Sequence, residues 1–192
     1  MSQVQAAAPS RHLSGTKSLA FCAFFAALIS ICTFIRIPIP PVPITLQLFA
    51  TILAGLLLGP KLGMLSCAIY VLLGLLGLPI FTGGGGIQYV VHPTFGFLVG
   101  FILGTGLTGW LAQRLKNKSI LNLCLVSYAG LVIVYLLGVP YYLFIMNIYM
   151  GKSVGLAAAL MSTYVVFIPG DIIKCILASI IAKRLLPEMR RF

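Results

Sequence analysis

The chain has 192 residues, of which 60% are hydrophobic and only 8% are charged. Its mean hydropathy of +1.12 is higher than one soluble core of this length can hide, so the composition excludes a soluble globular domain and predicts an integral membrane protein. The formal net charge of +11 could suggest nucleic-acid binding, but the basic residues lie in short flanks of apolar stretches, so we expect no nucleic acid among the partners.

Apolar stretches close to the ~20 residues needed to cross a bilayer recur along the chain. We therefore predict an all-α integral membrane protein, in which residues 18–186 form a six-transmembrane-helix bundle within the lipid bilayer. Residues 1–17 form a cytoplasmic tail before it, and residues 187–192 form a basic tail after it. The predicted spans are Ser18–Ile35, Ile44–Gly59, Leu62–Phe81, Thr94–Gln113, Ser119–Leu137 and about Ser162–Ala182.

The positions of lysine and arginine orient these spans. If the N-terminus is cytoplasmic, ten of the thirteen basic residues lie inside, Arg36 and Lys152 lie outside, and Lys174 lies within the sixth span. The positive-inside rule therefore favours an even number of spans, with both termini in the cytoplasm. The first apolar run is too long for a cleaved export signal. The ten inside residues are Arg11, Lys17, Lys61, Arg114, Lys116, Lys118, Lys183, Arg184, Arg190 and Arg191.

The first span carries Ala23 and Ala27 at helical spacing, a pair that could face either a neighbouring helix or another subunit. A longer series of small residues in the fourth span is interpreted as internal helix packing, because small side chains allow two helices to approach closely. This series consists of Gly96, Gly100, Gly104 and Thr108.

The first outside loop is rich in proline. The segment Arg36–Thr45 reads RIPIPPVPIT, and its prolines remove backbone donors and favour an extended, stiff chain. This arm is either a simple break between two helices or one wall of a binding site. Gln47, just inside the second span, is a polar candidate for a ligand contact beside the arm.

The second outside loop, Phe81–Phe97, contains four consecutive glycines. Glycine lets the backbone approach a ligand closely and present its amides, and the apolar and aromatic neighbours are a poor composition for a solvated linker. We therefore expect a packed cap over a binding site, without a phosphate-binding motif. One candidate, His92, could instead be an interfacial polar group. The candidate ligand-binding residues of this loop are Gly84, Gly85, Gln88, Tyr89 and His92.

After the fifth span, the segment Gly138–Gly151 is apolar and aromatic. Gly138 and Pro140 predict a break from the preceding helix. We expect a short helix or re-entrant piece at the outer interface, whose tyrosines either belong to the interfacial aromatic belt or close the mouth of a pocket.

Two opposite charges, Asp171 and Lys174, lie in the sixth predicted span. Asp171 is one of only two acidic residues in the chain, and the other, Glu188, lies in the basic tail. Charges at such a depth are costly and usually functional, and their i, i+3 spacing lets them neutralise each other or a shared ligand. Pro169 interrupts the helix just before Asp171, about one third of the way in, so polar groups can be satisfied where a ligand lines the break. The alternative is an ion pair that only fixes the helix, although hydrophobic residues often replace such pairs without loss of stability.

The residue inventory argues against catalysis. The chain has two histidines, one intramembrane carboxylate and no paired carboxylates, HExxH or nucleotide-binding motif. The five cysteines show no CxxC spacing and are interpreted as packing residues, so we expect no catalytic residue, no metal site and no cofactor. A membrane-embedded binding protein remains possible, as does a homo-oligomeric channel or facilitator for a small polar solute, with Asp171 and Lys174 lining its pore.

The proline-rich first loop, the stretch GGGGIQYVVHPTFGFLVGF and the segment PGDIIKC together resemble the BioY family, the biotin-specific substrate-binding subunits of energy-coupling factor (ECF) transporters. The resemblance covers nearly the whole chain, from Ser18 to Leu186. It implies high-affinity biotin binding and uptake in a prokaryotic cell membrane, with a transmembrane coupling subunit and two cytoplasmic ATPase subunits as partners. It also implies that Ala23 and Ala27, as an Ala-x-x-x-Ala element, dock the coupling subunit.

The chemistry of biotin suggests roles for the charged pair. The ureido ring has two N–H donors and one carbonyl acceptor, and a flexible tail carries a carboxylate. Asp171 is suited to accept from a ureido N–H, because a charge-assisted bond is stronger than a neutral one. Lys174 could bond the ureido carbonyl or pair with the tail carboxylate, and the orientation of the ligand stays open at this point. Since the two residues are about 5 Å apart along a helix, we expect them to share one end of the ligand.

Overall fold

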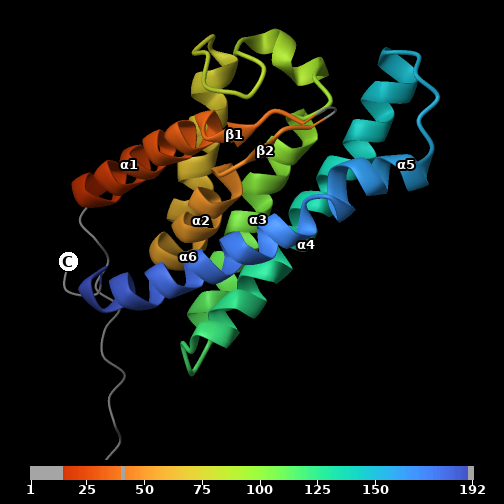
Figure 1. Cartoon of the computed structure of the whole chain (residues 1–192). Coiled ribbons are helices and arrows are strands. Elements are labelled where there is room, and N and C mark those ends of the chain that lie inside the picture. Colours follow the sequence, from red (N-terminus) through yellow and green to blue (C-terminus); the bar gives the residue numbers. More distant parts are fainter. Residues whose placement is uncertain (1–14, 40–41, 190–192) are drawn as a thin grey trace, which may run out of the picture.

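The computed structural model describes residues 15–39 and 42–189, which form a helical bundle (Figure 1). Residues 1–14 and 190–192, with Arg11, Arg190 and Arg191, lie outside the described residues, as do residues 40–41 of the proline-rich arm. The elements in chain order are α1 (Gly15–Phe34), β1 (Arg36–Ile37), β2 (Ile44–Thr45), α2 (Gln47–Leu75), the 3₁₀-helix η1 (Ile87–Val91), α3 (Phe95–Arg114), α4 (Ile120–Phe144), the π-helix η2 (Ile145–Tyr149), α5 (Leu156–Leu160), the π-helix η3 (Met161–Val165) and α6 (Ile168–Met189).

Within the described residues, five helical segments are long and apolar enough to cross a membrane. This finding confirms the prediction of an all-helical membrane protein, although the sequence predicts six spans. The difference arises in α2, which covers most of the second and third predicted spans.

The helix α2 is broken in its middle. Gly59 has φ 78° and ψ −174°, which are not helical values, and Pro60 follows it. A Cβ atom placed on Gly63 would lie only 3.2 Å from the carbonyl oxygen of Ala54. A continuous helix would separate these two residues by about 13 Å. The chain therefore reverses at Gly59, where the predicted second span ends, and the two parts of α2 pack against each other.

The predicted helix break at Gly138 and Pro140 is wrong, because α4 continues through both residues to Phe144 and then widens into η2. Gly138 serves close packing, since a Cβ atom placed there would lie 2.3 Å from the ring of Phe97. Pro140 lies on the exposed side of α4. The chain thus retains helical geometry up to Tyr149, with no separate helix after a break.

The last predicted span also begins earlier than expected. Helical structure starts at Leu156, turns at residues 166–167 and restarts as α6. Pro169 therefore lies in the first turn of α6, where backbone N–H groups have no partner within the helix. The break predicted before Asp171 is present, but it precedes Pro169 and puts Asp171 in the first helical turn.

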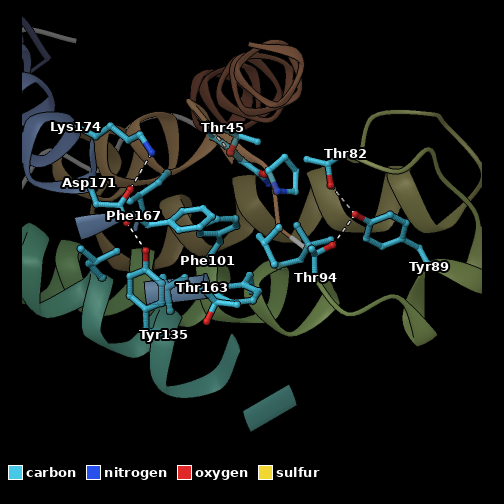
Figure 2. A pocket seen from close by; sticks show the side chains of 18 residues that line it. Thr45, Thr82, Tyr89, Thr94, Phe101, Tyr135, Thr163, Phe167, Asp171 and Lys174 are labelled. Atoms are coloured by element: carbon cyan, nitrogen blue, oxygen red, sulfur yellow. Dashed lines mark hydrogen bonds and ion pairs between the residues drawn. The ribbon is translucent and has the colours of Figure 1, made fainter. Parts of the chain in front are cut away.

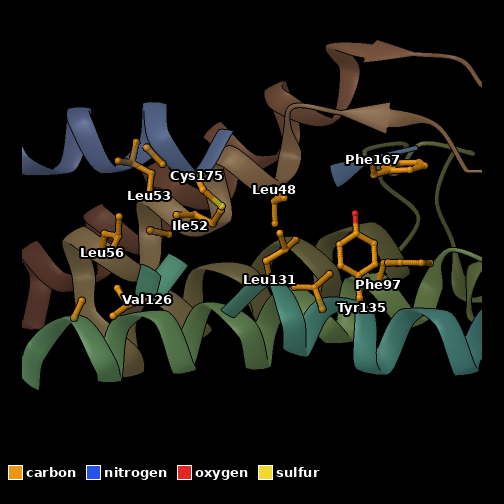
Figure 3. Close-up of a cluster of buried hydrophobic side chains, with 14 of the residues drawn as sticks. Leu48, Ile52, Leu53, Leu56, Phe97, Val126, Leu131, Tyr135, Phe167 and Cys175 are labelled. Atoms are coloured by element: carbon orange, nitrogen blue, oxygen red, sulfur yellow. The ribbon is translucent and has the colours of Figure 1, made fainter. Parts of the chain in front are cut away.

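The helices pack around α3, which lies against both α2 and α4, while α1 covers α2 and α6 lies across α2 and α4 (Figure 1). The predicted internal packing of the small residues in α3 is confirmed. A Cβ atom on Gly104 would lie 2.6 Å from the carbonyl oxygen of Gly130, and one on Gly100 would lie 2.8 Å from the Cα atom of Val134. Figure 3 shows the apolar core that α2, α4 and α6 share, with Leu53 of α2 among the labelled side chains.

Two loops cover one end of this bundle. In the arm, defined as residues 36–45, β1 and β2 pair in antiparallel fashion with Arg36 opposite Thr45. The glycine loop, defined as residues 82–86, is hydrogen-bonded to the arm, where the guanidinium of Arg36 donates to the carbonyl of Thr82. It is also hydrogen-bonded to α2, where the N–H of Gly86 donates to the carbonyl of Gly74 at 2.7 Å. The glycine loop is therefore a packed cap, as the sequence predicts.

Candidate ligand-binding site

A cavity lies beneath the arm and the glycine loop (Figure 2). Its empty volume, including the open space at its mouth, is about 610 Å³. Residues from α2, α3, α4 and α6 form its walls, and residues from the two loops cover it. The lining residues are Val42, Pro43, Thr45, Gln47, Leu48, Thr82, Tyr89, Thr94, Phe97, Leu98, Phe101, Leu131, Val134, Tyr135, Thr163, Phe167, Asp171 and Lys174.

The inner polar end of the cavity is built around Asp171. Nζ of Lys174 lies 2.8 Å from Oδ1 of Asp171, and the hydroxyl of Tyr135 donates to Oδ2. Asp171 is 2% exposed and Lys174 is 8% exposed. A buried carboxylate is thus neutralised by an ammonium and held by a phenol, and its position in the first turn of α6 is favoured by the helix dipole.

Gln47, at the start of α2, brings an unsatisfied donor to the cavity wall. Its side chain is 3% exposed, and its Nε2 atom makes no hydrogen bond with any described residue. The side chain of Tyr70 is its polar neighbour, and the Tyr70 hydroxyl donates to the carbonyl of Ile80 at 3.1 Å and lies 3.2 Å from Oγ1 of Thr33. A buried amide without a partner costs free energy, so this donor is suited to an acceptor on a ligand.

The outer polar end of the cavity is a chain of hydroxyl groups. The Tyr89 hydroxyl lies 2.9 Å from Oγ1 of Thr82 and 2.8 Å from Oγ1 of Thr94. Oγ1 of Thr94 also lies 2.7 Å from Nδ1 of His92. Figure 2 shows Thr82, Tyr89 and Thr94 at the end of the cavity opposite Asp171 and Lys174.

The section between the two polar ends is apolar and aromatic. The labelled rings of Phe101 and Phe167 lie between them in Figure 2, and Phe97 and Val134 also line this section. The ring of Phe97 meets that of Tyr135 edge to face, with centroids 6.1 Å apart. The cavity therefore suits an elongated ligand with an apolar body and a polar group at each end.

The structure places the predicted ligand-binding residues differently. Asp171, Lys174, Gln47 and Tyr89 line the cavity, whereas Gly85, Gln88 and His92, together with Tyr89, line a second pocket. Gly84 lines neither hollow and adopts a positive φ of 112°. The second hollow, called the outer pocket below, is lined by Gly83, Gly85, Gln88, Tyr89, Val91, His92, Pro93, Tyr149 and Met150.

His92 acts on the cavity only through its neighbours. Its ring stacks on that of Tyr89, with centroids 4.6 Å apart and 16° between the planes. The backbone N–H of Thr94 donates to Nδ1 of His92 at 3.3 Å, a geometry that requires the neutral imidazole with its proton on Nε2. Burial lowers the pKa of His92 below its ordinary value, which also favours the neutral ring.

Several lining residues were not singled out by the sequence analysis, above all Tyr135, Phe167 and the threonines. Aromatic residues in an apolar span have the same signature whether they pack against a helix or line a cavity. Tyr135 carries a weak signal, since a phenol within a span needs a hydrogen-bond partner. The partner of the Tyr135 hydroxyl is the carboxylate of Asp171. The two residues are 36 positions apart in the sequence, and they meet because α4 packs on α6.

The predicted docking residues lie on another part of the molecule. Ala23 and Ala27 are exposed on α1, and neither lines the cavity. The neighbouring side chains Phe24 and Ile31 are each 59% exposed. This face of α1 is therefore covered by no other described part of the chain.

Known proteins of one family are similar to this chain over most of its length. Residues 3–191 match the BioY family. The chain is 38% identical over 175 residues to the "Probable biotin transporter BioY" of Lysinibacillus sphaericus, covering 91% of this chain and 89% of that protein. It is 43% identical over 162 residues to the "Biotin transporter BioY" of Thermotoga maritima, covering 84% of this chain and 90% of that protein.

A solved structure is also similar to this one. It is the crystal structure of the S-component for biotin from an ECF-type ABC transporter, and it superposes with a TM-score of 0.80 at 34% sequence identity. The superposition covers 91% of this chain and 94% of the other. Together with the sequence matches, it confirms the family resemblance predicted from the loop and helix motifs.

Proposed function

The chain belongs to the BioY family, and from this premise we propose that it binds biotin and takes it up as the substrate-specific subunit of an ECF transporter in the cell membrane. Relatives named as biotin transporters cover most of the chain, and the similar solved structure is an S-component for biotin. The chain acts as a transport subunit and not as an enzyme. Its partners are a transmembrane coupling subunit and two cytoplasmic ATPase subunits.

The observation that carries this proposal is the buried ion pair in the cavity wall. A carboxylate and an ammonium, 2.8 Å apart, lie on the wall of the cavity that Gln47 also lines, and Nε2 of Gln47 makes no hydrogen bond with a described residue. A pair that served the scaffold alone would gain little over apolar residues of similar size. A ureido ring can donate to Asp171 and accept from Lys174 or Gln47, so it uses all three groups.

The two ends of the cavity also favour one orientation of biotin. The charge of Lys174 is already neutralised by Asp171, so a ligand carboxylate at this end would bring two carboxylates to one ammonium in an apolar environment. The outer end offers the hydroxyls of Thr82 and Thr94 and lies on the side of Arg36. We therefore place the ureido ring against Asp171 and the tail carboxylate at the outer end.

The topology that fits this function has six membrane crossings, with both termini cytoplasmic and residues 18–186 as the membrane domain. The reversal at Gly59 supports this topology, because it makes two antiparallel helices of α2. The excess of lysine and arginine at one end supports the orientation. The cavity then opens toward the outside, where free biotin is captured.

Equilibrium titration of the purified chain with biotin, thiamine and riboflavin tests the proposed function. We expect saturable binding of one biotin per chain and no binding of the other two vitamins. Asp171→Asn and Lys174→Ala should each abolish biotin binding in folded protein, whereas Ser179→Ala, a buried change elsewhere on α6, should leave it intact. Solute conductance without a saturable biotin site would instead support the channel or facilitator.

A further inference from the structure

The four side chains at the outer polar end form one hydrogen-bonded chain. Its links join Thr82 to Tyr89 at 2.9 Å, Tyr89 to Thr94 at 2.8 Å, and Thr94 to Nδ1 of His92 at 2.7 Å. Figure 2 shows the first two links as dashed lines at the end of the cavity. Each hydroxyl carries a single proton, so three hydroxyl protons serve three links. The donor at one link therefore fixes the donors at the others.

The imidazole of His92 sets this direction in the structure. Nδ1 accepts from the backbone N–H of Thr94 at 3.3 Å and so carries no proton. The Thr94 hydroxyl must then donate to Nδ1, the Tyr89 hydroxyl to Oγ1 of Thr94, and the Thr82 hydroxyl to the Tyr89 oxygen. All three hydroxyl protons are thus directed along the chain toward His92, and none is left for a ligand.

This direction does not suit the biotin carboxylate that the proposed function brings to the outer end. An ionised carboxylate only accepts hydrogen bonds, whereas Thr82 offers it oxygen lone pairs. The aligned hydroxyl dipoles also turn their negative ends toward that charge. If Thr82 alone turned its proton to the carboxylate, the Tyr89 oxygen would lose its donor and the other dipoles would still oppose the anion. Reversal of the whole chain removes both penalties.

Reversal requires a donor at the far end of the chain, where His92 lies. With a proton on Nδ1, His92 donates to Thr94, Thr94 to Tyr89 and Tyr89 to Thr82, which leaves the Thr82 proton for the carboxylate. An imidazolium supplies this donor and also a positive charge that offsets the anion. The ring is half-buried and lines the outer pocket, so it can exchange a proton with solvent.

The surroundings of His92 keep its ring neutral until an anion is nearby. Burial lowers the pKa of His92, and among the described residues no charged side chain lines the outer pocket. Arg36 approaches the other end of the chain, where its guanidinium donates to the carbonyl of Thr82. The other titratable side chains that line the outer pocket or bond to the neighbouring backbone are Tyr89, Tyr149 and Tyr141.

We propose that the biotin carboxylate, bound at the outer end, reverses this chain and that His92 takes up one proton from solvent as it does so. The proton forms an N–H bond at Nδ1 and converts the imidazole to an imidazolium, while the carboxylate remains ionised. Biotin and the proton together add no net charge to the site, which lowers the cost of burying the carboxylate. This proposal rests on the proposed function and deepens it, because His92 becomes a residue that selects a ligand with an ionised tail.

Titration calorimetry in two buffers of different ionisation enthalpy measures the proton uptake. For the whole chain in nanodiscs at about pH 6.5, we expect uptake of about 0.5 to 1 proton per biotin. The dissociation constant should fall by about tenfold from pH 7.5 to pH 5.5, since binding raises the affinity of His92 for the proton. Biotinamide, whose tail is neutral, should bind without uptake. Equal uptake with both ligands would assign the proton to another group, such as Asp171, and overturn the proposal.

His92→Gln tests whether His92 holds the proton. Its amide can accept from Thr94 or donate to it but does not titrate, so the chain can reverse without proton uptake. We expect biotin binding with no uptake and with a dissociation constant independent of pH in this range. His92→Phe, which keeps a ring beside Tyr89, should likewise bind without uptake. Tyr149→Phe removes another titratable group from the outer pocket and should retain the wild-type uptake.

Two results would overturn the role of His92. Uptake that persists in His92→Gln would show that the biotin carboxyl group itself binds in its protonated form. Biotin binding by the wild type without any uptake would show that Thr82 turns alone or that the imidazole proton moves from Nε2 to Nδ1. Either result leaves the proposed function in place, whereas absence of biotin binding by the wild-type chain would overturn the proposed function as well.

Discussion

The hydroxyl of Tyr135 on α4 donates a hydrogen bond to Asp171 on α6, on the carboxylate oxygen that Lys174 does not contact. Both oxygens of the carboxylate thus have a partner within the protein. Asp171 is held in one orientation between two helices, so an approaching ligand meets an acceptor that is already positioned.

Tyr135→Phe should destabilise the protein without abolishing biotin binding. The change leaves Oδ2 of Asp171 buried without its phenol partner, which costs about 1–3 kcal/mol for an unsatisfied buried group. Thermal unfolding without ligand should therefore occur at lower temperature. Biotin should restore more stability to the variant than to the wild type if a ureido N–H takes the vacated oxygen. Equal unfolding temperatures for the two unliganded proteins would contradict this role of Tyr135.

A double substitution distinguishes the structural role of the Asp171–Lys174 ion pair from its role in ligand binding. Asp171→Ala alone leaves a buried ammonium unpaired and should destabilise the chain by about 3–5 kcal/mol. The combination of Asp171→Ala with Lys174→Met removes both charges, so most of this stability should return. Biotin binding, measured by titration calorimetry, should remain absent in both variants. Recovery of binding together with stability would show that the pair only fixes α6.

Much of this site could be predicted because its signals are local. Asp171 and Lys174 are conspicuous in an apolar segment, and the glycine run and proline-rich arm predict the two loops that cover the cavity. The boundary between the second and third predicted spans coincides with the reversal at Gly59. In each case, the sequence departs from the apolar background that a membrane helix requires.

The remaining features depend on contacts between distant segments. Gly138 had the local signature of a helix break, but the Phe97 ring occupies the space beside it and makes it a packing residue. The loop candidates Gly85, Gln88 and His92 were correctly assigned to a packed cap, yet only the fold places them on the outer pocket and not on the cavity. Local composition cannot distinguish the two faces of such a loop.

The pH dependence of stability should report on His92. Burial lowers the pKa of its imidazole below the ordinary value of about 6.5, and Nδ1 accepts from the N–H of Thr94. The unfolded chain therefore binds a proton more readily than the folded chain, so stability is lost as the pH falls through about 6.5 and levels off below the folded pKa. The unfolding temperature of the wild type should fall between pH 7.5 and pH 5.5 more steeply than that of His92→Gln, which cannot titrate in this range. Parallel profiles for the two proteins would rule out this contribution.

The exposed face of α1 should be required for assembly but not for capture of biotin. Ala23 and Ala27 lie on this face and line neither hollow, and the small side chains allow a partner helix to approach closely. Ala23→Trp and Ala27→Trp fill that space, so we expect each to reduce co-purification with the coupling and ATPase subunits and to abolish biotin uptake. Biotin binding by the isolated chain should be unchanged, because the cavity lies elsewhere. Leu121→Trp on α4, at a side chain that is 69% exposed, is the matched control and should assemble normally. Intact assembly of both alanine variants would place the docking surface on another helix, whereas loss of biotin binding in either would indicate that α1 shapes the cavity as well.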